Sequence, residues 1–460
     1  MELRRELGLA GAVALCVGTM VGSGIFFGPQ QVARELGDAS LVLLAWVVAG
    51  LLALAGALVF AEYASAIPSS GGASYTFLAA AWPRPLAFLG GWTALVASYG
   101  GGVAAVSVAF ASFAVRLAGH DPLARPMSVA AIAIALLYFL AFVNWQGLRH
   151  GSRVQGAATA LKVAAVAALA AGGLWAAAAV ESDAPAAPAE AAHLTPLVFL
   201  AALVVPIFAY SGYIAAAQMG DEVRDPRRTL PRALVLGPLA VIGLYLLVNV
   251  AYLAVLGSAG LANSSLPGYE LATASLGEHG GTALALAVLV STFGTTNAIL
   301  MAAPRVAFAL AREGLFPPAL ADVGARGTPG PAIALVAGAG MALVAAGLAL
   351  RPVLGRPLFE FLVMVEVFAP GLFAVLIGVG LLRLRRARPD LPRPFRVPLY
   401  PVLPLAWAGT MVAVAVALVA QRPVEAGIGA AIVTSGLPVY AWMTREPRRP
   451  ARPQAVAAPA

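Results

Sequence analysis

Residues 9–32 read LAGAVALCVGTMVGSGIFFGPQQV, an apolar run interrupted at its centre by Gly22, Ser23 and Gly24. A helix of about 20 apolar residues crosses a bilayer, so this run is long enough to span. Glycine is common in membrane helices, mostly for close packing, so the triplet alone indicates a packing notch as readily as a break. A second run, LVVPIFAYSGYIAAAQMG at residues 203–220, carries Pro206 and then a Ser-Gly pair at a similar depth. Interruptions at corresponding depths favour two broken helices, a pattern that marks the binding site in proteins built from repeated halves.

The composition indicates an all-α integral membrane protein. The chain of 460 residues is 61% hydrophobic and 11% charged, with a mean hydropathy of +0.87, whereas soluble domains are about 25% charged. Runs long enough to span a bilayer predict twelve transmembrane helices. We expect them near residues 7–33, 39–61, 86–115, 127–144, 154–180, 194–219, 233–257, 281–304, 329–350, 361–382, 399–421 and 426–444.

The charge distribution predicts the orientation of these helices. The net charge is +8, and 28 of the 29 basic residues are arginine. With the N-terminus in the cytoplasm, 22 arginines fall on the cytoplasmic side of the twelve spans and six fall outside. This bias follows the positive-inside rule, so we expect both termini in the cytoplasm and a location in the cell membrane. The basic balance therefore reflects topology rather than a nucleic-acid partner, and the tail at residues 445–460, rich in Pro, Ala and Arg, is predicted to be disordered.

Several classes of function lack their signatures in this sequence. Cys16 is the sole cysteine, so no internal disulfide forms, and the four histidines share no metal-ligand spacing. We therefore expect no metal and no cofactor. No phosphate-binding GxxxxGK[ST] motif and no nucleophile–base constellation appears, which argues against an ATP-driven pump in one chain and against an enzyme. The rings of one residue type that line a channel, and the long basic central loop of a transporter with two six-helix halves, are also missing.

The two breaks predict the chemistry of the ligand. Unwinding a helix leaves N–H and carbonyl groups without intrahelical partners, and lipid cannot satisfy them. The half-helix that begins near Ile25 directs its positive end at the break, which suits a carboxylate. The half-helices that end near Met20 and Ala209 present carbonyl groups, which suit an ammonium. A ligand that carries both groups side by side is an α-amino acid.

Motifs along nearly the whole chain resemble the amino acid–polyamine–organocation (APC) permeases. They are GTMVGSGIF, IPSSGGASY, FAYSGY followed by GDEVRDPRRTLPRAL, APRVAFALAREGLFP and RPDLPRPFRVPLYP, in the order of the family. The resemblance implies a LeuT-like fold with helices 1 and 6 broken. In that fold residues 1–180 (helices 1–5) and 194–384 (helices 6–10) are inverted repeats, and residues 397–444 add helices 11 and 12.

The resemblance also implies which residues contact the substrate. The first-helix loop for the carboxylate matches Gly22, Ser23, Gly24 and Ile25, and the sixth-helix strip for the amino group and side chain matches Phe208, Ala209, Tyr210, Ser211 and Gly212. Glu62 matches an acid that ends helix two in the family. The sequence departs from the family at Tyr213, often a tryptophan in L-type transporters, in the Ala-Ser-Tyr after Gly72, and at Glu366, which stands on helix ten in place of an expected tryptophan.

Lys162, the only lysine, lies inside the apolar run at residues 154–180. If the helix begins near Gly151, a rise of about 1.5 Å per residue places Lys162 near the middle of the roughly 30 Å hydrocarbon layer. A charge at that depth costs roughly 2.5–3.5 kcal/mol on insertion scales, so we expect a functional role with a named partner rather than chance placement or snorkelling.

The resemblance implies a role for this lysine. Sodium-coupled members of the fold hold an ion between the first-helix break and helices five and eight, and the Lys162 ammonium would take its place as a fixed tether or as a proton carrier. The expected acceptors are first-helix carbonyl groups near Gly18 and Val21 and the helix-eight hydroxyls of Ser291, Thr292, Thr295 and Thr296.

Glu366 is a second charge within a span, with three roles open to it. It selects a cationic substrate side chain, carries a proton, or lines a wet vestibule. The stretch from Tyr99 to Gly102 indicates close packing or a widened side-chain pocket, and Tyr213 is a further candidate for selectivity or gating.

Together these features predict a sodium-independent amino acid transporter that works by alternating access, as an exchanger or a proton symporter. Its partners are a small amino acid and the lipid bilayer. A transporter of polyamines or cationic amino acids on the same fold, and an amino acid sensor that does not transport, stay open as alternatives.

Overall fold

The computed structural model describes residues 8–67, 73–146, 151–179, 194–214, 217, 223–322 and 328–445. Over these ranges the chain is helical and contains no β-strand. Eleven helices are long and apolar enough to cross a membrane, or twelve when the bent pair at the N-terminus is counted as one span. The prediction of an all-α protein with twelve transmembrane helices is therefore confirmed. Only Arg445 of the predicted disordered tail lies within the described residues, and the assignment of inverted repeats stays a prediction.

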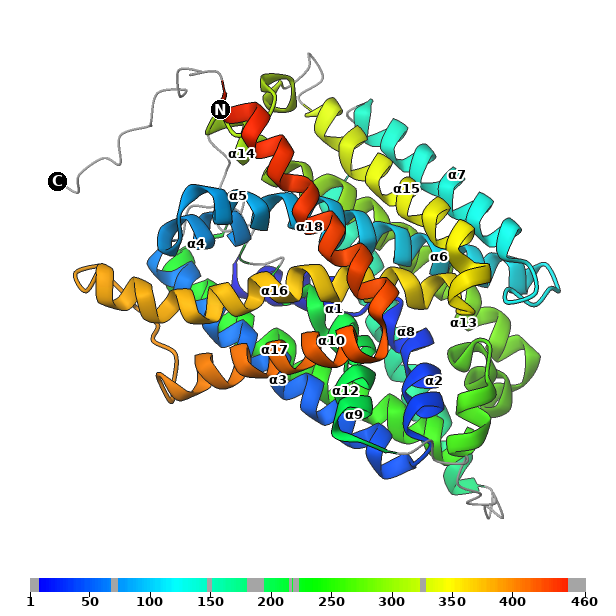
Figure 1. Ribbon diagram of the computed structural model, residues 1–460. Coiled ribbons are helices and arrows are strands. Elements are labelled where there is room, and N and C mark those ends of the chain that lie inside the picture. The colour runs from blue at the N-terminus through cyan, green and yellow to red at the C-terminus, as the bar shows by residue number, and fades with distance from the viewer. Residues whose placement is uncertain are drawn as a thin grey trace.

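The spans follow one another along the chain, with short helices between some of them (Figure 1). They are Leu9–Met20 (α1) with Gly24–Leu36 (α2); Ala39–Ala66 (α3); Arg84–Thr93 (α5), the π-helical turn Ala94–Tyr99 (η1) and Gly100–Leu117 (α6); Pro126–Trp145 (α7); Gly151–Ala179 (α8); Pro196–Ala202 (α9), Val204–Tyr210 (α10) and the 3-10 turn Ser211–Ile214 (η2); Pro226–Asn263 (α12); Pro267–Ala302 (α13); Gly330–Leu354 (α15); Leu358–Ala387 (α16); Val402–Gln421 (α17); and Pro423–Thr444 (α18). The short helices are Ala73–Ala81 (α4), Pro304–Arg312 (α14) and the 3-10 turn Pro318–Ala321 (η4).

The connection between the seventh and eighth spans differs from the prediction. We expected spans at 233–257 and 281–304 with a loop between them, but most of that connection is helical because α12 continues to Asn263 and α13 begins at Pro267. The turns of direction fall on Gly257 and Gly277, whose φ angles are 68° and 71°. Only glycine adopts that left-handed region readily, so each helix continues past its turn in a new direction.

The first span is bent as predicted. The axes of α1 and α2 differ by 45°, and the break falls on the Val21–Ser23 segment. The sixth span changes character at the predicted place, because α10 ends at Tyr210 and the chain continues as the 3-10 turn η2. Residues 215–216 and 218–219 of the predicted sixth span lie outside the described residues.

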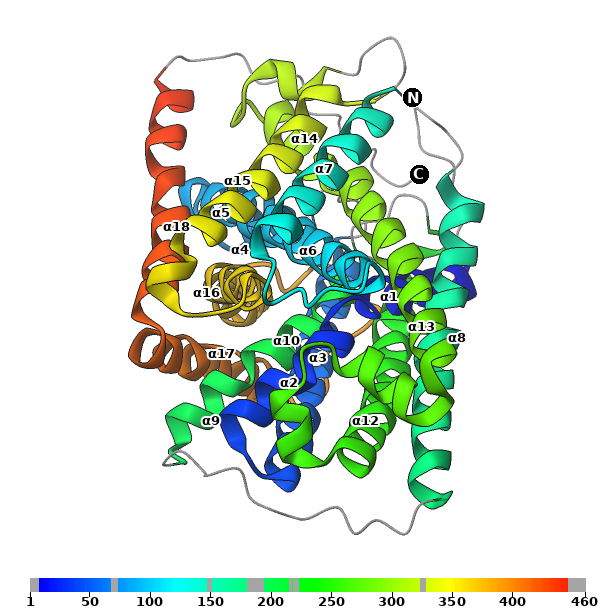
Figure 2. The ribbon, with the colours of Figure 1, turned by 90° about the vertical axis from the view of Figure 1, so that its right-hand side faces the viewer.

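The two interrupted spans lie among the helices that surround them. Segments α1 and α2 contact α12, α10 contacts α2, α3 and α16, and η2 contacts α1. The helix α8 packs against α12, α13 and α1, as Figure 2 also shows. The π-helical turn η1 and α6 contact α16, which crosses the middle of the molecule in Figure 1. This arrangement brings residues of α1, α3, η1, α6, α10, α13 and α16 around one central space.

Candidate functional site

The two breaks contact each other directly. The hydroxyl Oγ1 of Thr19, at the end of α1, donates to the carbonyl of Gly212 in η2 at 2.8 Å. Just beyond the first break, a Cβ atom on Gly24 would lie 2.6 Å from the Cβ of Ala209, closer than two carbon atoms approach. Position 24 therefore requires glycine, because a side chain would prevent the start of α2 from approaching the backbone of α10 so closely.

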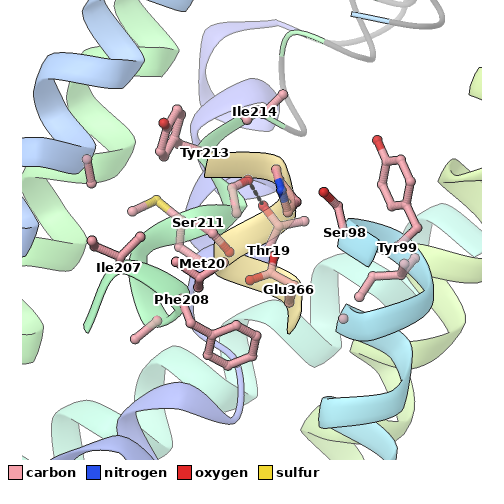
Figure 3. Close-up of a pocket in the computed structure, with 18 of the residues that line it drawn as sticks. Thr19, Met20, Ser98, Tyr99, Ile207, Phe208, Ser211, Tyr213, Ile214 and Glu366 are labelled. Carbon is pink, nitrogen blue, oxygen red and sulfur yellow. Dashed lines mark hydrogen bonds between the residues drawn. The ribbon is translucent and has the colours of Figure 1, made fainter. Parts of the chain in front are cut away.

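A cavity of about 640 Å³ lies where the breaks meet (Figure 3). Ligand pockets typically measure about 300–1,000 Å³, so this space is large enough for a small organic molecule. Seven of the nine residues predicted to bind substrate line the cavity: Gly22, Ser23, Gly24, Phe208, Ala209, Ser211 and Gly212. The other two, Ile25 and Tyr210, are fully buried and do not line it. Tyr210 packs instead between Trp46 and Tyr245.

The first break offers hydrogen-bond donors to this cavity. The amide groups of Phe26 and Phe27 donate to the carbonyl of Ser23. The amide groups of Gly24 and Ile25 come earlier, in the first turn of α2, where no carbonyl of the same helix can accept from them. The hydroxyl of Ser23 is buried and has no partner among the residues that the structure describes. These groups form the positive end of a helix, which suits an anion.

Two tyrosines on α12 bond to backbone carbonyl groups at the breaks, and the sequence reasoning did not identify them. The Tyr245 hydroxyl donates to the carbonyl of Met20 at 2.8 Å and lies 3.4 Å from that of Ala209, while Tyr252 donates to Ile25 at 3.2 Å. The carbonyl groups of Met20 and Ala209 were expected to face a ligand ammonium. The Met20 carbonyl already accepts from Tyr245, so one of its two lone pairs is used within the protein.

Lys162 joins three helices. Its side chain is buried in the lipid-spanning part of α8, and its Nζ atom donates to the carbonyl of Gly18 in α1 and, at 3.1 Å, to Thr295 Oγ1 in α13. These are two of the acceptors expected from the resemblance. Lys162 itself does not line the cavity, but Thr295 does. The ammonium therefore lies one side chain behind the cavity wall.

The other expected acceptors have different surroundings. Thr292 and Thr296 donate to carbonyl groups of their own helix, at 2.7 Å to Val288 and 2.9 Å to Thr292. Ser291 is buried, and its hydroxyl has no partner within the described part of the chain. The amide of Val21 bonds to Val17 and closes the last turn of α1.

Glu366 lies on α16 and lines the cavity, as do Tyr99 and Tyr213. Ser211 of the sixth-helix break lies next to Glu366 (Figure 3). Its Oε2 atom is buried and has no hydrogen-bond partner among the described residues. Figure 3 shows Glu366 beside Thr19 and Ser211, with Ser98 and Tyr99 across the cavity. The stretch from Tyr99 to Gly102 thus both packs closely and shapes the pocket, since a Cβ on Gly101 would lie 3.3 Å from Glu366 Cβ while Tyr99 and Gly102 line the cavity.

The cavity lies on one side of the breaks. Its lining includes Gly11, Ala14 and Leu15 of α1, but no residue of α2 beyond Gly24. On the α2 side, Phe359 stacks on Phe27 with ring centroids 4.8 Å apart and meets Phe208 edge-on at 5.9 Å. These rings separate the cavity from the end of the bundle at which α2 terminates.

Ion pairs close the same end of the bundle, which we call the α2 end. Glu360 pairs with Arg34 at 3.1 Å and with Arg356 at 3.6 Å. Arg356 also contacts Glu425 at 3.5 Å, and Arg422 pairs with Glu35. These contacts join α2, α16 and α18 at the α2 end, beyond the last α2 residue that lines the cavity.

A second set of polar contacts lies at the opposite, arginine-rich end. Glu62 is completely buried and accepts from Arg385 at 2.8 and 2.6 Å and from the Val397 amide at 2.7 Å, which fixes the segment after α16 to α3. Tyr75 of α4 donates to Glu313. Burial, together with the neighbouring Glu313 carboxylate, raises the pKa of the Tyr75 phenol well above its usual range, so it remains a donor at any physiological pH.

Comparison with known proteins places these features in a family. A family model described as amino acid permease matches residues 7–443. The chain is 30% identical over 453 residues to the serine/threonine exchanger SteT of Bacillus subtilis (strain 168), covering 96% of this chain and 98% of that protein. It is 30% identical over 454 residues to the large neutral amino acids transporter small subunit 2 of Homo sapiens (96% and 80%) and 28% identical over 445 residues to the human Asc-type amino acid transporter 1 (96% and 82%).

The resemblance predicted from the sequence motifs is thereby confirmed. The described part of the chain contains no group of three or more His, Cys, Asp or Glu residues that would hold a metal ion. The fold, the two interrupted spans and the full-length match agree with one another. This protein belongs to the amino acid permease family, and it is a multi-pass membrane transport protein rather than an enzyme.

Proposed function

We propose that this protein exchanges α-amino acids across the cell membrane by alternating access, without sodium. The observation that carries the proposal is the cavity where the breaks of helices 1 and 6 meet. The donors at the start of α2 suit a carboxylate, and the backbone of the sixth-helix break offers acceptors for an ammonium nearby. The name of the serine/threonine exchanger, which this chain matches over 96% of its length, supports exchange of amino acids.

The proposed orientation puts the arginine-rich end and both termini in the cytoplasm. The α2 end then faces outward, and it is closed by the Phe27–Phe359 stack and the ion pairs of Glu360. In this conformation the cavity is accessible from the cytoplasmic side. Transport requires a second conformation in which the contacts at the α2 end separate and those around α1 close.

Lys162 supports the proposal that sodium is not needed. Its ammonium bonds the Gly18 carbonyl and the Thr295 hydroxyl, and so places a positive charge between α1, α8 and α13. A cation held covalently at this point replaces one that would otherwise bind from solution. We propose that Lys162 acts as a fixed tether, because both of its described contacts are to protein groups and Lys162 itself does not line the cavity.

Counterflow in proteoliposomes tests the proposal. The purified protein is reconstituted into sodium-free vesicles loaded with unlabelled alanine, and uptake of labelled alanine is followed. We expect accumulation that depends on internal amino acid and is unchanged when sodium is added. Strict dependence on sodium would contradict the role of Lys162. Uptake driven by a proton gradient into empty vesicles would indicate symport, and binding without counterflow would indicate a sensor.

A further inference from the structure

Glu366 is the acidic residue in a cavity wall that is otherwise largely apolar. The same lining includes Ile207, Phe208, Val367 and Phe373. The other charged lining residue is Arg305, near the start of α14. An acidic side chain among apolar groups is costly to bury unless its oxygen atoms find hydrogen-bond donors.

The carboxyl group of Glu366 is only partly satisfied by the protein. Ser211 lies next to it (Figure 3), and the Oε2 atom has no hydrogen-bond partner within the described residues. A buried acceptor without a donor is costly, so a ligand group that donates to it removes that cost. Lys162, the other buried charge near the breaks, bonds to two protein groups instead.

Ser211 connects this carboxyl to the proposed substrate position. It belongs to the sixth-helix break, lines the cavity and neighbours Glu366. Gly24 packs on Ala209, two residues before Ser211, so the first break is close as well. An amino acid held by its backbone groups at the breaks therefore has its side chain within reach of Glu366.

We propose that Glu366 determines substrate specificity by accepting a hydrogen bond from the substrate side chain. The favoured substrates are amino acids whose side chains end in a donor, either a hydroxyl or a cationic group. An apolar side chain of similar size leaves the carboxyl unpaired. Sites built to hydrogen-bond a substrate reject analogues without the polar group far more strongly than they reject a missing methylene. This inference rests on the proposed amino acid transport and adds the class of side chain.

Competition for labelled alanine, which has no side-chain donor, provides the test. Serine and threonine represent hydroxyl donors, lysine and arginine represent cations, and leucine and valine represent apolar side chains. For the wild-type protein we expect the hydroxyl amino acids, the cationic amino acids or both to compete about tenfold better than the apolar ones. A difference of that size corresponds to one hydrogen bond to a charged group. In Glu366→Leu the donor and apolar classes should compete equally well, whatever rate of alanine exchange remains.

Two variants complete the design. Glu366→Gln keeps the size and one acceptor, so it should retain a preference for hydroxyl side chains and lose one for cations. Glu278→Leu, at an exposed position of α13, is the matched control and should leave all ratios unchanged. A ratio that survives in Glu366→Leu, or a wild-type protein without preference for either donor class, overturns the inference.

The outcome separates this inference from the proposed function. Alanine exchange with unchanged ratios contradicts the role of Glu366 alone. If no amino acid exchanges, the proposed function fails, and thermal-shift measurements with the same amino acids then decide whether Glu366 selects a bound ligand. In that assay Glu366→Leu should lose the stabilisation by donor side chains and keep that by leucine.

Discussion

Lys162 and Glu366 are both charged residues in membrane-spanning helices near the breaks, but the protein treats them differently. Lys162 lies behind the cavity wall and bonds to Gly18 and Thr295. Glu366 lines the cavity, with Ser211 as neighbour and one oxygen atom without a partner among the described residues. An intramembrane charge bonded to protein groups holds helices together. An intramembrane charge that faces a cavity and has an atom without a hydrogen-bond partner can bind a ligand.

The contrast depends on the two interrupted spans, since Lys162 bonds to α1 just before the first break and Glu366 lies next to Ser211 at the second (Figure 3). Gly24→Ala should disturb both, because the added Cβ would lie 2.6 Å from Ala209 Cβ and 2.7 Å from its Cα. We expect counterflow to fall by roughly 100-fold, since small misplacements at a site have effects of that order. Gly243→Ala on α12, where the added Cβ meets nothing within 4 Å, should transport normally. Equal activity of the two variants would contradict the close approach.

Lys162→Met tests whether Lys162 has a different role from Glu366. Methionine fills a similar volume but donates no hydrogen bond, so the tether between α1, α8 and α13 is lost. We expect transport of all substrates to fall together by about 30-fold, the equivalent of roughly 2 kcal/mol for a lost bond to a charged group. The neighbouring lipid-facing Leu161, 45% exposed, provides the control Leu161→Met.

Two measurements on Lys162→Met keep its interpretation clear. Gel filtration should show a folded protein, because replacing a buried charge by an apolar side chain often leaves stability intact. Counterflow should remain low whether or not sodium is present. Full activity in the variant would mean that the side chain is dispensable.

Thr295→Val should have the smallest effect. It removes one neutral acceptor of Lys162 and leaves the Gly18 carbonyl in place, so counterflow should fall about fivefold, in line with roughly 1 kcal/mol for one hydrogen bond. Thr434→Val, at an exposed position of α18 where the hydroxyl bonds only within its own helix, should behave as wild type. A loss larger than that of Lys162→Met would show that Thr295 acts on the substrate directly, since it also lines the cavity.

Much of the fold was predictable because long apolar runs and arginine-rich connections are strong local signals. The bend at Gly22–Gly24 and the change at Ser211 were visible for the same reason. The helical connection between Gly257 and Gly277 was not, because its polar residues and glycines resemble those of a loop. The conformation was also unpredictable, since one sequence serves every state of a transport cycle.

Part of the candidate site was also predictable from the sequence and part was not. The residues at the breaks and the acceptors Gly18 and Thr295 followed from motifs and from a family resemblance. Tyr245 and Tyr252 were missed because their partners, Met20 and Ile25, lie more than 200 residues away along the chain. A signal was available, since two tyrosines seven residues apart lie on one face of an apolar helix.

The most direct test of the account compares Lys162→Met and Glu366→Leu in one sodium-free counterflow assay with serine, lysine and leucine as competitors of labelled alanine. We predict that Lys162→Met lowers alanine uptake without changing the order of the competitors. Glu366→Leu should instead keep much of the uptake and lose the preference for side chains that donate a hydrogen bond. The opposite pattern, with Lys162→Met altering the order and Glu366→Leu lowering uptake alone, would contradict the assignment of Lys162 to the framework and Glu366 to the substrate.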